Sequence, residues 1–127
     1  MGRAPRVLIV EDDPEMRRAY AAMLSSGGFE TDEAHNGLQA LEKTLSSPPD
    51  LILTDIAVPG IDGIELCRRV RADARTRDIP LLAITGYGGR HYDDRAVSAG
   101  ANYVLAKPCD PDVLVREARQ LVGADGK

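Results

Sequence analysis

The chain has 127 residues, of which 43% are hydrophobic and 28% charged, and its formal net charge is −4. This length suits one domain with its own core, and the negative charge argues against a basic surface for nucleic acid or anionic membrane. Two cysteines without CxxC spacing and two histidines argue against a zinc site, and no apolar stretch approaches the length of a membrane span. We therefore expect a cytoplasmic protein with free thiols, folded as a single domain over residues 1–127 with a core from about 6 to 122.

Short apolar runs alternate along the chain with segments of helical periodicity. The expected strands cover residues 6–10, 29–34, 51–55, 79–85 and 102–106. The expected helices cover residues 14–26, 37 to about 46, 62 to about 74, 90–99 and 111 to about 122. This alternation with short connections predicts an α/β fold in which helices cover both faces of a parallel sheet.

Three finer expectations concern segments rather than whole elements. Leu38, Leu41 and Leu45 share one face of the second helix, and we expect them to form its buried stripe. Residues 86–89 contain three glycines and predict a mobile loop, and residues 123–127 are expected to fray.

Polar residues follow four of the predicted strands. Glu11 and Asp12 come directly after the first strand, Asp55 ends the third, Thr85 ends the fourth and Lys107 follows the fifth. Because the carboxyl ends of parallel strands meet at one edge of the sheet, we expect these side chains to converge there. Asp13 is set apart from them, since it can cap the helix that Pro14 begins.

Three carboxylates at one edge repel each other, by as much as about 4 kcal/mol per close pair at a surface-like dielectric. A hard cation relieves this repulsion, and Mg²⁺ typically takes one or two carboxylates while it keeps several waters. The carboxylate of Asp55 could then attack phosphorus and form an acyl phosphate. Lys107 and the hydroxyl of Thr85 would supply partners for the phosphoryl oxygens.

Four motifs occur in order along the chain: Val10-Glu11-Asp12, the segment 55–63 around Asp55, Ile84-Thr85-Gly86, and the segment 100–108 that ends in Lys107-Pro108. With these motifs the chain resembles the receiver domain of two-component response regulators from Arg6 to Val122. The resemblance implies a (βα)5 flavodoxin-like, doubly wound sheet of five parallel strands in the order 2-1-3-4-5.

The resemblance also implies roles for individual residues. It makes Asp55 the phosphoacceptor, and Glu11 and Asp12 the acid pair that binds Mg²⁺ directly or through water. The backbone carbonyl of Ala57 completes this metal site, to which Asp55 also contributes.

On the other side of the acceptor, the resemblance makes Thr85 the switch hydroxyl and Lys107 the partner of the phosphoryl group. It further implies a cis peptide bond between Lys107 and Pro108.

The function implied is Mg²⁺-dependent transfer of a phosphoryl group from a phosphohistidine to Asp55, which switches protein–protein contacts. The donor would be a histidine kinase or a histidine phosphotransfer protein, and the chain would catalyse only its own phosphorylation and dephosphorylation. Neither nucleic acid nor membrane is an expected partner of this domain, and a homodimer is left open. The chain would be a stand-alone receiver or one cut from a larger response regulator or hybrid kinase.

One departure from the family lies three residues before Lys107, where Val104 replaces the usual aromatic residue. Tyr103 is adjacent, but a shift of one residue turns a side chain to the opposite face of a sheet. We expect Tyr103 to pack beneath a neighbouring helix, and the aromatic switch to be absent or altered, with Tyr87 or Tyr92 as substitutes. In this respect the chain is similar to receivers of hybrid histidine kinases.

Two other classes of protein are alternatives: a phosphatase of related sheet topology and a flavodoxin-like cofactor binder. A phosphatase with an aspartate nucleophile would want a second acid two residues after Asp55, where the chain has Ala57. A flavodoxin-like cofactor binder would want a glycine-rich phosphate cradle after the first strand, where Glu11 and Asp12 would instead repel phosphate.

Overall fold

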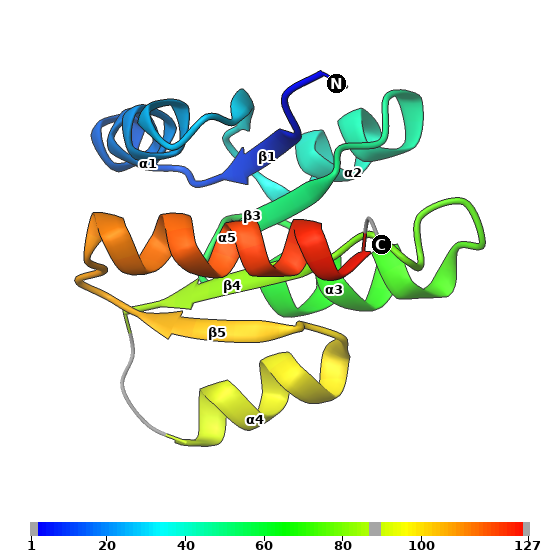
Figure 1. Cartoon of the computed structure of the whole chain (residues 1–127). Helices are drawn as coiled ribbons and strands as arrows, with labels where there is room; N and C mark the ends of the chain where they lie inside the picture. The colour runs from blue at the N-terminus through cyan, green and yellow to red at the C-terminus, as the bar shows by residue number, and fades with distance from the viewer. Residues whose placement is uncertain (1–2, 87–89, 126–127) are drawn as a thin grey trace.

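A sheet of five parallel strands forms the centre of the molecule (Figure 1). The computed structural model describes residues 3–86 and 90–125. In this part of the chain the strands are β1 (Arg6–Val10), β2 (Glu30–Ala34), β3 (Leu51–Asp55), β4 (Leu81–Thr85) and β5 (Tyr103–Ala106). They lie in the order β2-β1-β3-β4-β5, so the predicted sheet and its strand order are confirmed.

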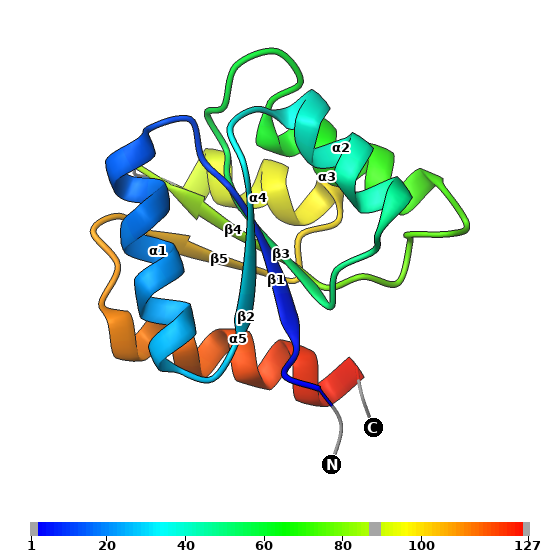
Figure 2. The ribbon, with the colours of Figure 1, turned by 90° about the horizontal axis from the view of Figure 1, so that it is seen from above.

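Helices cover both faces of this sheet. They are α1 (Pro14–Ser26), α2 (Gly37–Ser46), α3 (Gly63–Ala72), α4 (Arg90–Ala99) and α5 (Pro111–Asp125). Figure 2 shows α1 and α5 on one face and α2, α3 and α4 on the other. Within the described residues, none of these helices is both long and apolar enough to cross a membrane.

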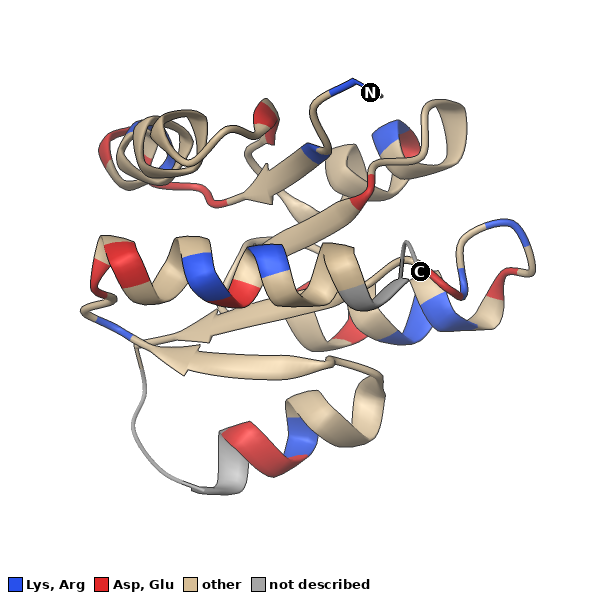
Figure 3. Ribbon diagram, in the orientation of Figure 1, with Lys and Arg blue, Asp and Glu red and all other residues tan. Residues whose placement is uncertain are grey.

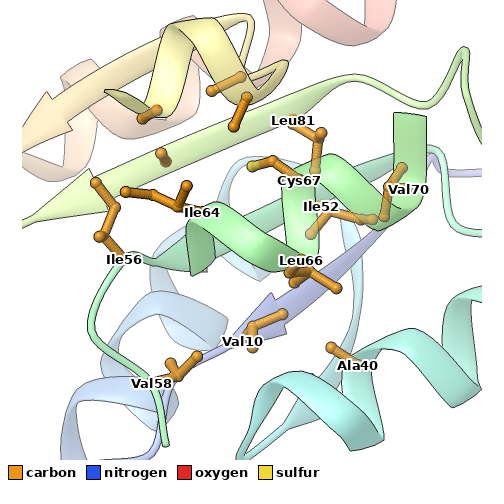
Figure 4. Packing of buried hydrophobic residues seen from close by; sticks show 14 of the residues in the cluster. Val10, Ala40, Ile52, Ile56, Val58, Ile64, Leu66, Cys67, Val70 and Leu81 are labelled. Atoms are coloured by element: carbon orange, nitrogen blue, oxygen red, sulfur yellow. The ribbon is translucent and has the colours of Figure 1, made fainter. Parts of the chain in front are cut away.

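The two faces of the sheet carry two separate cores, because alternate residues of a strand point to opposite sides. The core under α2, α3 and α4 includes the residues labelled in Figure 4: Val10, Ala40, Ile52, Ile56, Val58, Ile64, Leu66, Cys67, Val70 and Leu81. The core under α1 and α5 includes Tyr20, Leu24, Leu53, Leu114 and Ala118. Strand β3 is buried along its whole length, which explains its continuous apolar run.

The predicted orientation of α2 is wrong. Leu38 is 54% exposed, and Leu41 and Leu45 are only partly buried. The buried residues of this helix are Gly37, Ala40 and Thr44, one position earlier in each turn. The start of α2 lies so close to Ile61 that a Cβ on Gly37 would clash with its backbone.

Two helix ends also differ from prediction. α3 ends at Ala72, because Asp73 is extended and its side chain accepts hydrogen bonds from the backbone and the guanidinium of Arg75. α5 continues to Asp125, three residues beyond the expected end near Val122. Three residues of the loop predicted to be mobile, 87–89, and the side chain of Tyr92 lie outside what the structure describes.

Candidate phosphoacceptor site

The register of the parallel strands brings the polar residues to one edge of the sheet. Val10 is paired with Thr54, and Asp55 with Ile84. The residues that follow these positions therefore emerge side by side. Thr85 is paired with Ala106, which places Lys107 next to the end of β4.

Asp55 is held at the end of β3 with only 7% of its surface exposed. Its Oδ1 accepts a hydrogen bond of 2.9 Å from the backbone N–H of Ala57, and its Oδ2 lies 2.5 Å from the Nζ of Lys107. The start of α3 packs against its backbone, where a Cβ on Gly63 would lie 2.4 Å from the carbonyl oxygen of Asp55. These contacts fix both the strand end and the direction of the carboxylate.

Glu11 is the second buried carboxylate of the site, with 2% of its surface exposed. Its Oε1 accepts from the Nζ of Lys107 at 3.3 Å, and its Oε2 accepts from the backbone N–H of Asp13 at 3.1 Å. Burial raises the pKa of Glu11 to about 7, and the neighbouring Asp55 adds to this rise, whereas Asp13 N–H and Lys107 oppose it. The pocket thus holds two buried carboxylates beside the ammonium of Lys107.

Lys107 lies between the two carboxylates, in the segment that joins β5 to α5. Figure 3 shows a basic residue, in blue, in this segment. Burial lowers the pKa of the Lys107 ammonium, but Asp55 and Glu11 more than offset this, so the net shift is upward and the side chain stays cationic. Its backbone N–H donates to the carbonyl of Thr85 at 2.9 Å, and its peptide bond to Pro108 is cis, as the resemblance implied. Thr85 is buried beside it.

The remaining predicted site residues are placed less tightly. Asp12 and Ala57 are exposed at the same edge of the sheet. Asp13 caps α1, since its side chain accepts from the backbone N–H of Glu15. Within residues 3–86 and 90–125, no three His, Cys, Asp or Glu side chains are close enough to enclose a metal ion. A site that leaves room for waters on Mg²⁺ does not require such an enclosure.

Arg17 contacts the site loop, although it is not among the site residues predicted from the sequence. Its guanidinium donates to the backbone carbonyl of Glu11 at 2.9 Å and to the Oε1 of Glu33 at 2.9 Å. The acceptor on Glu11 is a backbone atom, so no motif in the sequence marks it. Its position one turn after the acid pair is the only signal that sequence reasoning could have used.

The prediction for Tyr103 is wrong. Its side chain is 45% exposed, because it opens the edge strand β5. Leu105, two residues later on the same face, is the one buried in the core under α1 and α5. Val104 faces the other core, against which it is partly buried.

Comparison with known proteins shows the family to which the chain belongs. The family model of the response regulator receiver domain matches residues 7–119, and the chain belongs to this family of two-component signalling proteins. It is 36% identical over 120 residues to the phosphate regulon transcriptional regulatory protein PhoB of Pseudomonas aeruginosa, which covers 94% of the chain and 52% of that protein. The chain spans about half the length of the first curated relatives that it matches.

Solved structures show the same fold. A response regulator from Chloroflexus aurantiacus superposes with a TM-score of 0.92 at 34% identity, over 95% of this chain and 99% of that one. The receiver domain of a sensor histidine kinase from Pseudomonas aeruginosa superposes with a TM-score of 0.88 at 31% identity, over 94% of this chain and 98% of that one. The latter structure has a magnesium ion coordinated in its active-site cleft.

Proposed function

We propose that this chain accepts a phosphoryl group on Asp55 from a phosphohistidine of a histidine kinase or a histidine phosphotransfer protein. The observation that carries the proposal is the carboxylate of Asp55, which ends the central strand and is contacted by Lys107 on one oxygen and by the Ala57 N–H on the other. A carboxylate held in this way is oriented for attack, and a permanent cation stands beside it for the incoming charge.

In the proposed reaction an oxygen of Asp55 attacks phosphorus. The new P–O bond forms as the N–P bond of the phosphohistidine breaks, and the released imidazole takes a proton from solvent. The ammonium of Lys107 would pair with one phosphoryl oxygen, and the hydroxyl of Thr85 would donate to another.

Glu11, Asp12, Asp55 and the backbone carbonyl of Ala57 would hold Mg²⁺. All four offer oxygen, the ligand that Mg²⁺ prefers, and the carboxylates of Glu11 and Asp55 share the ammonium of Lys107. When bound, Mg²⁺ neutralises charge on the phosphoryl oxygens.

We further infer that residues 6–122 form a single domain that acts in the cytoplasm. Phosphorylation would switch its contacts with other proteins, and the chain would catalyse only its own phosphorylation and dephosphorylation. Whether it works alone, as a homodimer or as part of a longer protein does not change the proposed chemistry.

The test is the intact mass of the protein after incubation with acetyl phosphate and Mg²⁺. We expect one added phosphoryl group, which is lost in Asp55→Asn and in EDTA but kept in the control Asp94→Asn, whose residue is exposed on α4. Beryllofluoride binding would detect a product that turns over too fast to trap. A folded chain that gives neither a phosphoryl adduct nor a beryllofluoride complex would contradict the proposal.

A further inference from the structure

Arg17 lies in the first turn of α1 and joins three parts of the molecule. Its Nη1 donates to the backbone carbonyl of Glu11 in the site loop, and its Nε donates to the Oε1 of Glu33 on β2, each at 2.9 Å. Its own backbone N–H donates to the carbonyl of Asp13 as part of the helix. The helix, the site loop and the edge strand are therefore connected through one side chain.

The contact with the Glu11 carbonyl matters most for Asp12. The carbonyl of Glu11 and the N–H of Asp12 belong to one rigid peptide plane, so holding the carbonyl also fixes where the backbone of Asp12 lies. Glu11 has further anchors in Lys107 and in the N–H of Asp13. The side chain of Asp12 is exposed and makes no hydrogen bond within the described residues.

The other partner of Arg17 is itself held in place. The backbone carbonyl of Glu33 accepts from the Nζ of Lys43 at 2.6 Å, and its N–H donates to the Oδ1 of Asp32 at 2.8 Å. The side chain of Arg17 is 19% exposed and that of Glu33 is 41% exposed, so the ion pair between them is partly open to water. Arg17 thus ties the loop that bears Glu11 and Asp12 to the strand β2.

We propose that Arg17 is a positioning residue for the magnesium site, and that its hydrogen bond to the Glu11 carbonyl aims the acid pair at the ion. The inference rests on the proposed function, because it assumes that the acid pair binds Mg²⁺. Residues that orient metal ligands from outside typically contribute about 10- to 100-fold to metal affinity.

The experiment is calorimetric titration of Mg²⁺ into the unaltered chain, Arg17→Ala, Arg17→Lys and Arg18→Ala. Arg18 is the matched control, because it is the next residue of the same helix, is exposed and carries the same charge. Loss of a cation alone would strengthen Mg²⁺ binding in both alanine variants. Loss of positioning instead weakens it about 10-fold or more in Arg17→Ala. A lysine has one donor group in place of the guanidinium fork, so Arg17→Lys should fall between.

Circular dichroism and melting in EDTA establish whether each variant is folded. If Arg17→Ala is not folded, the test is the Mg²⁺ affinity of Arg17→Lys compared with that of the unaltered chain. Weaker binding by the Arg17 variants, with binding by Arg18→Ala unchanged or stronger, would support the assignment. Mg²⁺ affinity in the Arg17 variants equal to that of Arg18→Ala would overturn it. A flat titration of the unaltered chain is a different result, since it would overturn the magnesium site itself and the role of Arg17 with it.

Discussion

Gly37 and Ile61 lie closer than any residue other than glycine would allow: a Cβ on Gly37 would stand 1.8 Å from the carbonyl oxygen of Ile61. Ile61 belongs to the loop that leads from Asp55 to α3, and Gly37 is the first residue of α2. The loop that carries Ala57 is therefore packed against the start of a helix, which limits where it can lie.

We expect Gly37→Ala to destabilise the fold, because the clashing atom is backbone and cannot swing away. Overpacking of this kind costs about 1–3 kcal/mol in the free energy of unfolding, measured by urea denaturation. Gly123→Ala is the control, since a Cβ there meets no atom within 4 Å. It lies within α5 and should stabilise the fold by up to about 1 kcal/mol. Equal stabilities of the two variants would contradict this account.

Thr44 offers a second test of the α2 face. Its Oγ1 is the buried side-chain oxygen or nitrogen without a hydrogen-bond partner among the described residues. Valine has nearly the same shape, so Thr44→Val should raise the free energy of unfolding by about 1 kcal/mol. The control is Thr76→Val, because the buried Thr76 hydroxyl donates to the carbonyl of Val70 at 2.8 Å. That variant should lose stability, and a gain in both would refute the interpretation.

The orientation of α2 could not be predicted from the sequence. Leu38, Leu41 and Leu45 repeat with helical spacing, but so do Gly37, Ala40 and Thr44, and apolarity favoured the leucines. The orientation of α2 depends on the space beside Ile61, where Gly37 lies. This contact joins segments that are distant in the sequence. The prediction for Tyr103 was wrong for a related reason. The alternation of residues along a strand shows which face of the sheet Tyr103 is on, but it does not show whether a helix covers that position.

The site itself was more predictable. Asp55 and Thr85 end their strands and Glu11 and Lys107 follow theirs, and parallel pairing alone brings strand ends to one edge. The contact of Arg17 with the Glu11 carbonyl was missed, since hydrogen bonds to backbone acceptors leave no mark on residue type.

The raised pKa of Glu11 predicts how stability depends on pH in the absence of Mg²⁺. Because this pKa is about 7 in the folded chain and near 4.5 when unfolded, the folded chain binds more protons between these values. The free energy of unfolding should therefore fall as pH rises from about 4.5 to 7, by roughly 3 kcal/mol in total, and level off above. Urea denaturation in EDTA at pH 5 and pH 7.5 measures the change.

Glu11→Gln is the control for this pH dependence, because it removes the titrating carboxyl and keeps its shape. The fall between pH 5 and 7.5 should shrink in this variant. Lowered carboxyl pKa values at Asp32 and Asp73 act in the opposite sense, but at more acidic pH. If the free energy of unfolding falls equally with pH in the unaltered chain and in Glu11→Gln, Glu11 is not the source of the pH dependence.

Addition of Mg²⁺ should raise the melting temperature, because the ion binds the folded site and relieves carboxylate repulsion. A concentration 100 times the dissociation constant stabilises by about 2.7 kcal/mol. Asp12→Asn should lose most of this gain and keep its melting temperature in EDTA, since Asp12 is exposed. Asp94→Asn should keep the full gain. A melting curve that millimolar Mg²⁺ leaves unchanged would argue against the metal site.

The acidic strand β2 has a consequence for how copies of this protein can meet. It is an outer strand of the sheet and carries Glu30, Asp32 and Glu33 in five residues. Two such edges brought together would align like charges, and only part of that charge is balanced by the ion pairs with Arg17 and Lys43. Charged side chains on an outer strand thereby oppose aggregation by sheet extension at this edge.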